Sequence, residues 1–373
     1  MNNEFVYPNY NHSILGIPNS LIRYYGGKGH HSSLPVLDRY LGQDYRNVVL
    51  IILDGMGVDM LRHNLSNLSF LRRHIRDQIT SVFPSTTVAA TTAYYSGLSP
   101  IEHGWLGWSP YFKDLKRVVE LYTNKDYYTG EPQDKPVTRK MGYSHICDQI
   151  ALADRDVGCT KIFPTFVDPN GPVDFNEFCL RIKQATRNKG RQFILAYWPE
   201  PDHTSHDFGP YSPEVQTVLK DQNAKIKKLC AGLKDSLVII SADHGHTETQ
   251  DVPINDYPEI MDCLAAPLSL DMRVQAVFLK PNKEQKFVRL FRQYLAKDFM
   301  LIKTTEALKM NLFGPGKPHP CARGFLGDYL ILAKGHKCLV QRFPGDCHHA
   351  LKGGHSGLTA PEMMVPLIVI ERK

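Results

Sequence analysis

Four short segments of the sequence bring together aspartates and histidines in patterns that suit metal binding. The segments are LDGMG (53–57), EPDHTSHDFGP (200–210), SADHGH (241–246) and GGHSG (353–357). Their candidate ligands are Asp54, Asp202, His206, Asp243, His244 and His355. Imidazole nitrogen and carboxylate oxygen are the ligand types that zinc and similar ions accept, and catalytic sites keep one coordination position open.

These six side chains, three carboxylates and three imidazoles, are enough for two metal ions with three ligands each. Two ions about 4 Å apart hold both the attacking and the leaving oxygen of an in-line displacement, which is chemistry for a phosphoryl group. A lone Asp after a strand is often only a helix cap or a turn residue. Three such residues, each flanked by Gly or His, favour a shared site.

A nucleophile is expected in SVFPSTTVAATTAYYSG (81–97), where an extended piece runs into a helix of small residues. A Thr at a helix start is ordinarily an N-cap. The same place attracts anions, because free N–H groups and the helix dipole face them. A metal that coordinates the Thr oxygen would make it an alkoxide nucleophile. Residues further along are expected to pack the helix: Thr91, Thr92 and Ser96.

Buried strands are expected where short apolar runs rich in β-branched residues occur. They are residues 47–54, 192–198, 236–243 and 365–371, with 161–167 as a further candidate. Continuous apolar runs indicate that both faces are covered, so we expect an α/β three-layer sandwich with a central, mostly parallel sheet. Helices are expected at 57–77, 87–96, 174–189 and 213–233.

The three aspartates follow three of these strands. Asp54 closes the first, Asp202 comes shortly after the second, and Asp243 closes the third. Ligands of parallel α/β sheets bind outside the carboxyl ends of the strands, so the three carboxylates can meet there.

The chain of 373 residues is expected to form a single catalytic domain, 1–373, with an inserted cap subdomain. The cap is expected at 251–350, which Pro and Gly interrupt and which contains the strand-like pieces VQAVFLK and DYLILAK. Residues 109–146 are interpreted as a second insertion, and 1–40 as an irregular segment around the core.

Composition excludes several classes of protein. Hydrophobic residues at 42% and charged residues at 22% are ordinary globular values. The longest aliphatic run has six residues, Val48 to Leu53, so no membrane span is expected. The net charge of +6 suits an anionic small molecule and is no signature of nucleic-acid binding. The eight cysteines are scattered and no secretory signal is visible, so we expect reduced thiols and a cytoplasmic protein.

The ordered motifs LDGMG, FPSTT, D-x-x-x-H, ADHGH and GGHSG resemble those of the alkaline phosphatase superfamily. Within it, FPSTT followed by SGLSPIEHG (96–104), together with PDHTSHDFGP, resembles the nucleotide pyrophosphatase/phosphodiesterase branch. The motifs span residues 47–370, and their combination is specific although each alone is weak. The family fold is a largely parallel sheet between helices, in agreement with the pattern of strands.

The resemblance implies a hydrolase that cleaves phosphodiester or phosphoanhydride bonds of a nucleotide-like phosphate ester. Thr87, the second Thr of FPSTT, would be the nucleophile and would form a phospho-threonine that water then hydrolyses. Two zinc ions would be bound. One would be held by Asp54, Asp243 and His244 together with Thr87. The other would be held by Asp202, His206 and His355.

One position departs from the branch. Where it usually has an Asn that helps to hold a phosphate oxygen, HGWLGW (103–108) has Trp108. Trp108 and Tyr111 would either stack on a base or pack a loop against the cap. His203 and His246 lie beside ligands as candidate outer-sphere or substrate contacts. The run Cys347-His348-His349 is interpreted as a polar loop rather than a metal site.

Alternative functions stay open on the sequence. A phosphomonoesterase or phosphonate hydrolase would use the same site, and Trp108 leaves diester and monoester preference undecided. An aryl sulfatase is disfavoured because FPSTTVA lacks the C/S-x-P-x-R context, and a mutase because such relatives use Ser and manganese. A metal-stabilised nucleotide sensor is disfavoured because all seven ligand and nucleophile positions are filled.

Overall fold

The computed structural model describes residues 5–344 and 350–373, and its centre is a six-stranded sheet in the order β2-β16-β7-β1-β6-β5. The strands are β1 (Asn47–Leu53), β2 (Ile75–Thr80), β5 (Val157–Ile162), β6 (Arg191–Trp198), β7 (Ser236–Ser241) and β16 (Met364–Arg372). β7, β1, β6 and β5 run parallel, whereas β16 pairs antiparallel with β7 and β2. Every residue of β1 and β7 is buried, as expected for strands covered on both faces.

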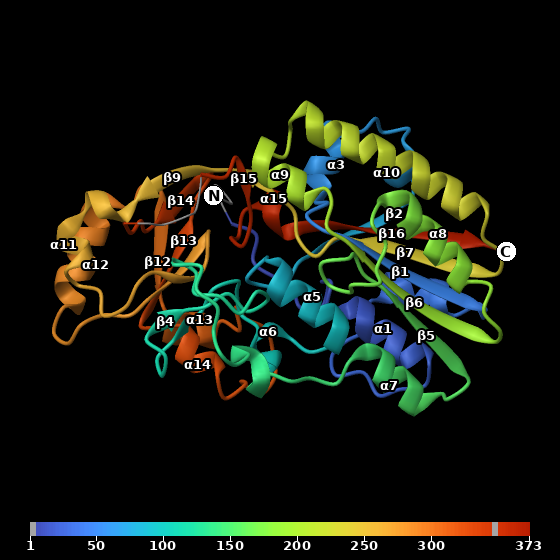
Figure 1. The fold of residues 1–373 in the computed structure, drawn as a ribbon, viewed down its shortest axis with the longest axis horizontal. Helices are drawn as coiled ribbons and strands as arrows, with labels where there is room; N and C mark the ends of the chain where they lie inside the picture. Colours follow the sequence, from blue (N-terminus) through green and yellow to red (C-terminus); the bar gives the residue numbers. More distant parts are fainter. Residues whose placement is uncertain (1–4, 345–349) are drawn as a thin grey trace.

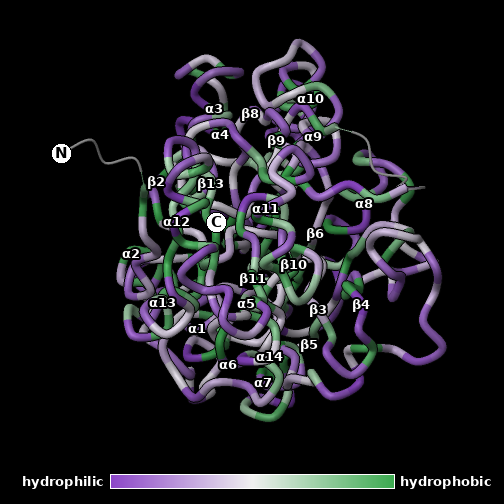
Figure 2. The backbone as a smooth tube through the Cα atoms, turned by 90° about the vertical axis from the view of Figure 1, so that its left-hand side faces the viewer, coloured by the Kyte–Doolittle hydropathy of each residue, from purple (hydrophilic) through white to green (hydrophobic). Residues whose placement is uncertain are grey.

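Helices cover both faces of this sheet (Figure 1). One layer contains α1 (Gly16–Tyr24), α5 (Thr87–Ser96) and α7 (Ile146–Ala153). The other contains α3 (Val58–Asn64), α8 (Phe175–Ala185), α9 (Asp202–Phe208) and α10 (Pro213–Ala231). The predicted three-layer sandwich is therefore confirmed. In Figure 2 the outer loops are mostly hydrophilic, while hydrophobic segments lie among the strands.

Two of the expected elements are wrong in their bounds. Residues 57–77 are not one helix: α3 ends at Asn64, α4 covers Phe70–Arg73, and β2 then begins. Ser66, Asn67 and Ser69 break the helix, because such side chains compete for backbone hydrogen bonds in turns. The strand expected at 161–167 lies earlier, as β5, because Pro164 has no N–H for the sheet.

A second, antiparallel sheet lies at the end of the molecule away from the C-terminus (Figure 1). Its order is β10 (Ser269–Asp271), β11 (Val274–Val277), β13 (Tyr329–Ala333) and β12 (Phe299–Lys303). β9 (Gln250–Pro253) pairs with β14 (Lys337–Val340) nearby. The accompanying helices are α11 (Pro258–Met261), α12 (Glu284–Tyr294), α13 (Thr304–Lys309) and α14 (Ala322–Phe325). One hydrophobic cluster lies within this part, and a second cluster is shared with α5, α6 (Pro100–His103) and α15 (Ala360–Met363), so the second sheet packs directly against the active-site side of the central domain.

The remaining elements are short. They are α2 (Pro35–Leu41), β3 (Tyr111–Phe112), β4 (Arg117–Val118), η1 (Val137–Lys140), β8 (Thr247–Glu248), η2 (Ile254–Asp256) and β15 (Gly353–Gly354). Within the described residues, none of the helices has the length and apolar character needed to span a bilayer.

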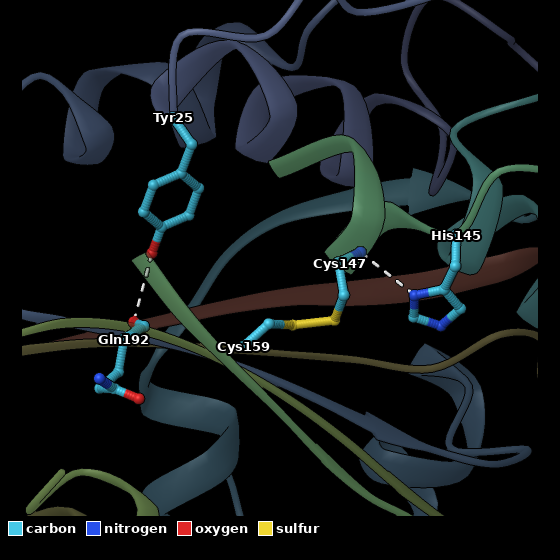
Figure 3. The surroundings of a disulfide bond; sticks show 5 residues. All are labelled: Tyr25, His145, Cys147, Cys159 and Gln192. Carbon is cyan, nitrogen blue, oxygen red and sulfur yellow. Dashed lines mark hydrogen bonds between the residues drawn. A yellow bond between two sulfur atoms is a disulfide. The ribbon is translucent and has the colours of Figure 1, made fainter. Parts of the chain in front are cut away.

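A disulfide bond joins Cys147 on α7 to Cys159 on β5 (Figure 3). The expectation that all thiols are reduced is therefore wrong for this pair. The two cysteines lie 12 residues apart without any tight motif, and only the packing of α7 along β5 brings their Cα atoms within 5.8 Å. Beside the bond, His145 caps α7 by accepting a hydrogen bond from the backbone N–H of Cys147 at 3.1 Å.

Removing this disulfide is expected to lower the free energy of unfolding. Closing a loop of this length contributes about 3 kcal/mol in the chain-entropy account. We expect the double variant Cys147→Ser/Cys159→Ser to unfold at lower urea concentration than the oxidised protein. Reductant should bring the wild-type protein to the level of the variant and leave the variant unchanged. A reductant effect of equal size in both proteins would contradict this assignment.

A buried histidine lies under the helix that begins at Thr87. His103 ends α6, is 1% exposed, and accepts a hydrogen bond from the backbone N–H of Trp105 at 3.0 Å. Burial lowers the pKa of His103 to about 3, with a contribution from nearby His319. The folded protein therefore keeps this imidazole neutral at pH values where the unfolded chain protonates it.

His103 is consequently expected to make folding sensitive to acid. Below the unfolded pKa of about 6.5 the unfolded state binds a proton that the folded state does not, so stability falls as pH drops toward 3. Between pH 7 and pH 5 this contributes about 2 kcal/mol of lost stability. Urea unfolding at both pH values should show a smaller loss in His103→Asn, by about that amount. The exposed control His63→Asn should keep the wild-type difference, and an unchanged difference in His103→Asn would refute the assignment.

Candidate active site and metal centre

The carboxyl ends of three neighbouring parallel strands bring the predicted aspartates together. Asp54 directly follows β1, Asp243 follows β7 by two residues, and Asp202 begins α9 after β6. The three aspartates are far apart in the sequence but close in space, because β7, β1 and β6 are adjacent in the sheet. The expected juxtaposition at one sheet edge is therefore present.

The first cluster consists of Asp54, Asp243 and His244, all buried. His244 Nε2 lies 3.3 Å from Asp54 Oδ1 and 3.4 Å from Asp243 Oδ2. Ligand atoms about 2.0–2.2 Å from a tetrahedral ion lie roughly 3.4 Å from one another, so these separations fit a shared cation. His244 Nδ1 donates to Gly245 O at 3.1 Å, which leaves Nε2 free to coordinate.

Two buried carboxylate oxygens of this cluster, Asp54 Oδ1 and Asp243 Oδ2, have no hydrogen-bond partner among the described residues. Burial raises the pKa of Asp54 well above its usual value, with repulsion from Asp243 and Asp202 adding to it. Burial likewise raises the pKa of Asp243, although His244 opposes the effect. Concentrated, unpaired negative charge of this kind fits a divalent cation.

The second cluster contains Asp202, His206, His355 and, in addition, His246. Asp202 lies 3.4 Å from His206 Nε2 and 3.5 Å from His355 Nε2, again close to the separation of ligands on one ion. His206 Nδ1 donates to Gly353 O at 2.9 Å, and His355 Nδ1 to Ser85 O at 3.1 Å. Both rings therefore present Nε2 to the centre of the cluster.

Charge in the second cluster is better balanced than in the first. Burial opposes ionisation of Asp202, but His206 and His246 hold its pKa well below the usual value. Burial also opposes protonation of His206, and Asp202 nevertheless raises the pKa of His206 to about 9.

His246 differs from the other histidines of the site. Its Nε2 lies 2.5 Å from Asp202 Oδ1, which is a hydrogen-bond distance and too short for two ligands of one ion. The ring is buried, and its Nδ1 has no partner among the described residues. His246 therefore orients the carboxylate of Asp202. In the sequence only its place two residues after His244 pointed to this role.

Thr87 rather than Thr86 faces the first cluster. Thr87 is the first residue of α5, and its Oγ1 lies 3.4 Å from Asp54 Oδ2 and 3.1 Å from His244 Nε2. Thr86 is the N-cap residue and is 1% exposed. The hydroxyl of Thr87 thus lies at a helix N-terminus, beside the candidate metal ligand His244 and within reach of Asp54 Oδ2, which can accept its proton.

Tyr197 is a site residue that the sequence analysis missed. It lies near the end of β6, and its hydroxyl donates a hydrogen bond to Asp54 Oδ2. Burial and the neighbouring carboxylates of Asp54 and Asp243 raise the pKa of Tyr197 well above its usual value, so the phenol stays protonated as a donor. Nothing in the apolar run of β6 distinguishes this tyrosine from a core residue.

A cavity of about 900 Å³ opens beside Thr87, and Asp54 and Asp202 line it. Its aromatic walls are formed by Tyr95, Trp108, Tyr122, Tyr143, Phe163, Phe166, Tyr197 and Trp198. Lys161 adds a cationic group, whereas burial and the neighbouring Lys161 lower the pKa of His145 to about 4, so that ring is neutral. A second cavity of about 940 Å³ lies at the second sheet, but none of the candidate metal ligands lines it.

Of the three predicted substrate contacts, two line this cavity and one does not. Trp108 and His203 line the cavity beside Thr87. The backbone N–H of Trp108 donates to Asp271 Oδ2 at 2.9 Å, which fixes the tryptophan from the second sheet. Tyr111 is not among the lining residues, and its ring packs against Phe278 at 5.2 Å. The run 347–349 lies outside the described residues.

Comparison with known proteins agrees with this arrangement. Residues 48–306 match the family model of type I phosphodiesterases/nucleotide pyrophosphatases. Bis(5'-adenosyl)-triphosphatase ENPP4 of Bos taurus is 25% identical over 259 residues, covering 65% of this chain and 57% of the relative. Ectonucleotide pyrophosphatase/phosphodiesterase family member 5 of Homo sapiens is 25% identical over 240 residues, covering 60% and 49%. The chain thus spans roughly half the length of these curated relatives.

Solved structures show the same fold. Murine ectonucleotide pyrophosphatase/phosphodiesterase 5 superposes with a TM-score of 0.62 at 19% identity, covering 86% of this chain and 87% of that one. An inactive variant of the murine protein in complex with AMP has a TM-score of 0.61 at 18% identity, with 87% of each chain covered. The chain therefore belongs to the type I phosphodiesterase/nucleotide pyrophosphatase family, the branch of the alkaline phosphatase superfamily that its motifs indicate.

Proposed function

We propose that this protein is a two-metal hydrolase that cleaves a phosphodiester or phosphoanhydride bond of a nucleotide-like substrate through Thr87. The observation that carries the proposal is the position of the Thr87 hydroxyl. It lies at the start of α5, 3.4 Å from Asp54 and 3.1 Å from His244, and it opens into the cavity that also contains Asp202.

The donor sets fit two divalent cations, most simply Zn²⁺, because both combine imidazole nitrogen with carboxylate oxygen. Asp54, Asp243 and His244 would hold one, with Thr87 beside them. Asp202, His206 and His355 would hold the other. Such a pair supplies stabilisation of negative charge on the attacking and leaving oxygens.

The protein's own groups then define the reaction. Oγ1 of Thr87 attacks phosphorus, and Asp54 Oδ2, which lies 3.4 Å away, takes up its proton. The bond from phosphorus to the leaving oxygen breaks, and the phosphoryl group is transferred to Thr87. Free N–H groups at the start of α5 stabilise its oxygens. Water then attacks phosphorus, which releases the product and restores the hydroxyl.

The cavity supports a substrate with a flat ring. Its aromatic walls suit stacking, and the Lys161 ammonium suits an anion. The relatives named for bis(5'-adenosyl)-triphosphate hydrolysis and the AMP complex of the murine protein favour a nucleotide. A phosphomonoesterase is the second candidate, because Trp108 lines the cavity where the branch has an amide donor.

A paired hydrolysis assay tests this proposal. Zinc-loaded protein is given bis(p-nitrophenyl) phosphate, the p-nitrophenyl ester of thymidine 5'-monophosphate, and p-nitrophenyl phosphate. We expect the nucleotide ester to have the highest kcat/KM and the monoester the lowest. Preference for the monoester would move the protein to the phosphatase class. Tight nucleotide binding without turnover at any metal loading would indicate a sensor instead.

A further inference from the structure

A buried ion pair connects the second sheet to the active-site loops. Arg273 lies just before β11, Glu362 lies in α15, and both side chains are fully buried. The guanidinium binds the carboxylate with two contacts, Nε to Oε1 at 2.7 Å and the terminal nitrogen to Oε2 at 3.0 Å. It also donates to the carbonyl oxygens of Gly335 and Lys337. The guanidinium of Arg273 is therefore held in one orientation by hydrogen bonds to these acceptors.

The Glu362 carboxylate holds the loop that follows the metal-ligand candidate His355. Oε1 accepts from Gly357 N at 2.7 Å, and Oε2 accepts from the hydroxyl of Thr359 at 2.5 Å. The backbone N–H of Arg273 donates to Ser356 Oγ at 3.0 Å. Ser356 has φ of +98°, a conformation that a non-glycine residue keeps only where its surroundings enforce it.

The same loop is bonded to the segment that carries Thr87. Ser85 Oγ donates to Gly357 O at 2.8 Å, and Ser85 O accepts from His355 Nδ1. Thr87 follows two residues later. A displacement of the loop at Gly357 therefore moves both the ring of His355 and the start of α5.

Glu362 also reaches the first metal cluster through its backbone. Its carbonyl oxygen accepts from Gly245 N at 2.7 Å, next to His244. A Cβ at Gly245 would lie 2.0 Å from Pro361 O, so α15 and this loop are in close contact. One residue thus contacts loops of both clusters.

Stability alone does not account for such a pair. A buried ion pair gains little over well-packed apolar residues, because two charges must lose their hydration. Burial opposes ionisation of Glu362, yet Arg273 holds its pKa below the usual value, so the carboxylate is charged and accepts every donor around it.

We infer that Arg273 and Glu362 are positioning residues of the active site, through which the second sheet holds the His355 loop in register with Thr87 and the first metal cluster. This inference rests on the proposed function and assigns to the second sheet a part in assembling the catalytic centre. Neither side chain lines the cavity beside Thr87.

The test compares Arg273→Lys and Glu362→Gln with Phe287→Leu. The lysine keeps the charge but loses the two-point contact, and the glutamine keeps the shape but loses the charge. Phe287 is fully buried in α12, in a hydrophobic cluster remote from the loops, so its variant is a control for lost stability. Each protein is measured as folded holoenzyme for kcat, KM and zinc affinity by competition with a chelator.

We expect both variants to bind one of two zinc equivalents at least tenfold more weakly, with kcat reduced ten- to hundredfold and KM changed less than threefold. Phe287→Leu should keep both equivalents and the wild-type kcat. Wild-type affinities and kcat in folded Arg273→Lys and Glu362→Gln would overturn the inference. If Glu362→Gln does not fold, Ser85→Ala tests the same connection without leaving a buried charge unpaired. A three- to tenfold reduction in kcat is then expected.

Amide hydrogen exchange separates this inference from the proposed function. In metal-free protein, exchange across residues 353–359 should accelerate at least tenfold in Arg273→Lys and stay unchanged in Phe287→Leu. Equal exchange in the two variants would refute the positioning role. If the wild-type protein binds zinc but hydrolyses no ester, the proposed function fails, while exchange and zinc affinity still decide the role of the ion pair.

Discussion

Replacing Thr87 by alanine is expected to reduce phosphodiester hydrolysis by roughly 10³-fold or more, because no other hydroxyl among the described residues contacts both Asp54 and His244. Folding should be preserved, since the side chain is only half-buried and alanine is a good helix former at the start of α5. The measurement is kcat/KM for the thymidine nucleotide ester, together with the zinc content of each protein.

Two further variants make this result specific to the Thr87 oxygen. Thr87→Ser keeps a hydroxyl and should retain more activity than the alanine variant by at least tenfold. Thr86→Ala removes the neighbouring hydroxyl, which lies at the N-cap, and should lower kcat less than tenfold. Undiminished activity in Thr87→Ala with full zinc content would exclude this nucleophile and turn attention to Thr86.

Removal of divalent metal is expected to abolish activity and to lower stability. The unpartnered oxygens of Asp54 and Asp243 would otherwise face each other and Asp202 in a buried site. An ion present at a thousand times its dissociation constant stabilises the folded state by about 4 kcal/mol. After dialysis against a chelator, the protein should therefore unfold at a temperature several degrees lower. Added Zn²⁺ should restore both the activity and the unfolding temperature.

Single variants assign the two sites separately. Asp243→Asn should lose one zinc equivalent from the first cluster, and Asp202→Asn should lose one from the second. Asp262 is half-exposed and forms ion pairs with Lys283 and Lys286 at the start of α12, so Asp262→Asn is a matched control that should keep both. Full activity after exhaustive chelation, with no zinc retained, would contradict a metal-dependent site.

The parts of the site that the sequence predicts are those set by local pattern. Asp54 and Asp243 can be placed because each ends a continuous apolar strand, and parallel strands carry such residues to one edge. His206 and His244 can be placed because they are four residues or one residue from an aspartate ligand. The paired glycines before His355 draw attention to this histidine in the sequence, although in the structure they form the short strand β15. The same apolar runs predict four of the six core strands, whereas β5 lies earlier than expected and β2, which is largely polar, is not predicted.

Tertiary structure alone decides the contacts between distant residues. Tyr197 meets Asp54 across 143 positions, and Arg273 meets Glu362 across 89. In β6 the residues from Phe193 to Trp198 are all apolar or aromatic, so no periodicity shows that Tyr197 faces the site. The sequence suggested Tyr111 as a substrate contact, but its ring packs against Phe278 beside the second sheet. The sequence does not show which partner an aromatic side chain in an insertion will meet.

The sequence by itself thus determined the fold class, the candidate metal ligands and the helix that begins at Thr87, because strand burial and motif spacing are local properties of the chain. The structure decided that Thr87 rather than Thr86 faces the metal cluster, that His246 bonds to Asp202, and that Cys147 and Cys159 are joined. These features depend on the direction in which a side chain leaves the backbone and on which elements pack together. Both are settled only when the whole chain has folded.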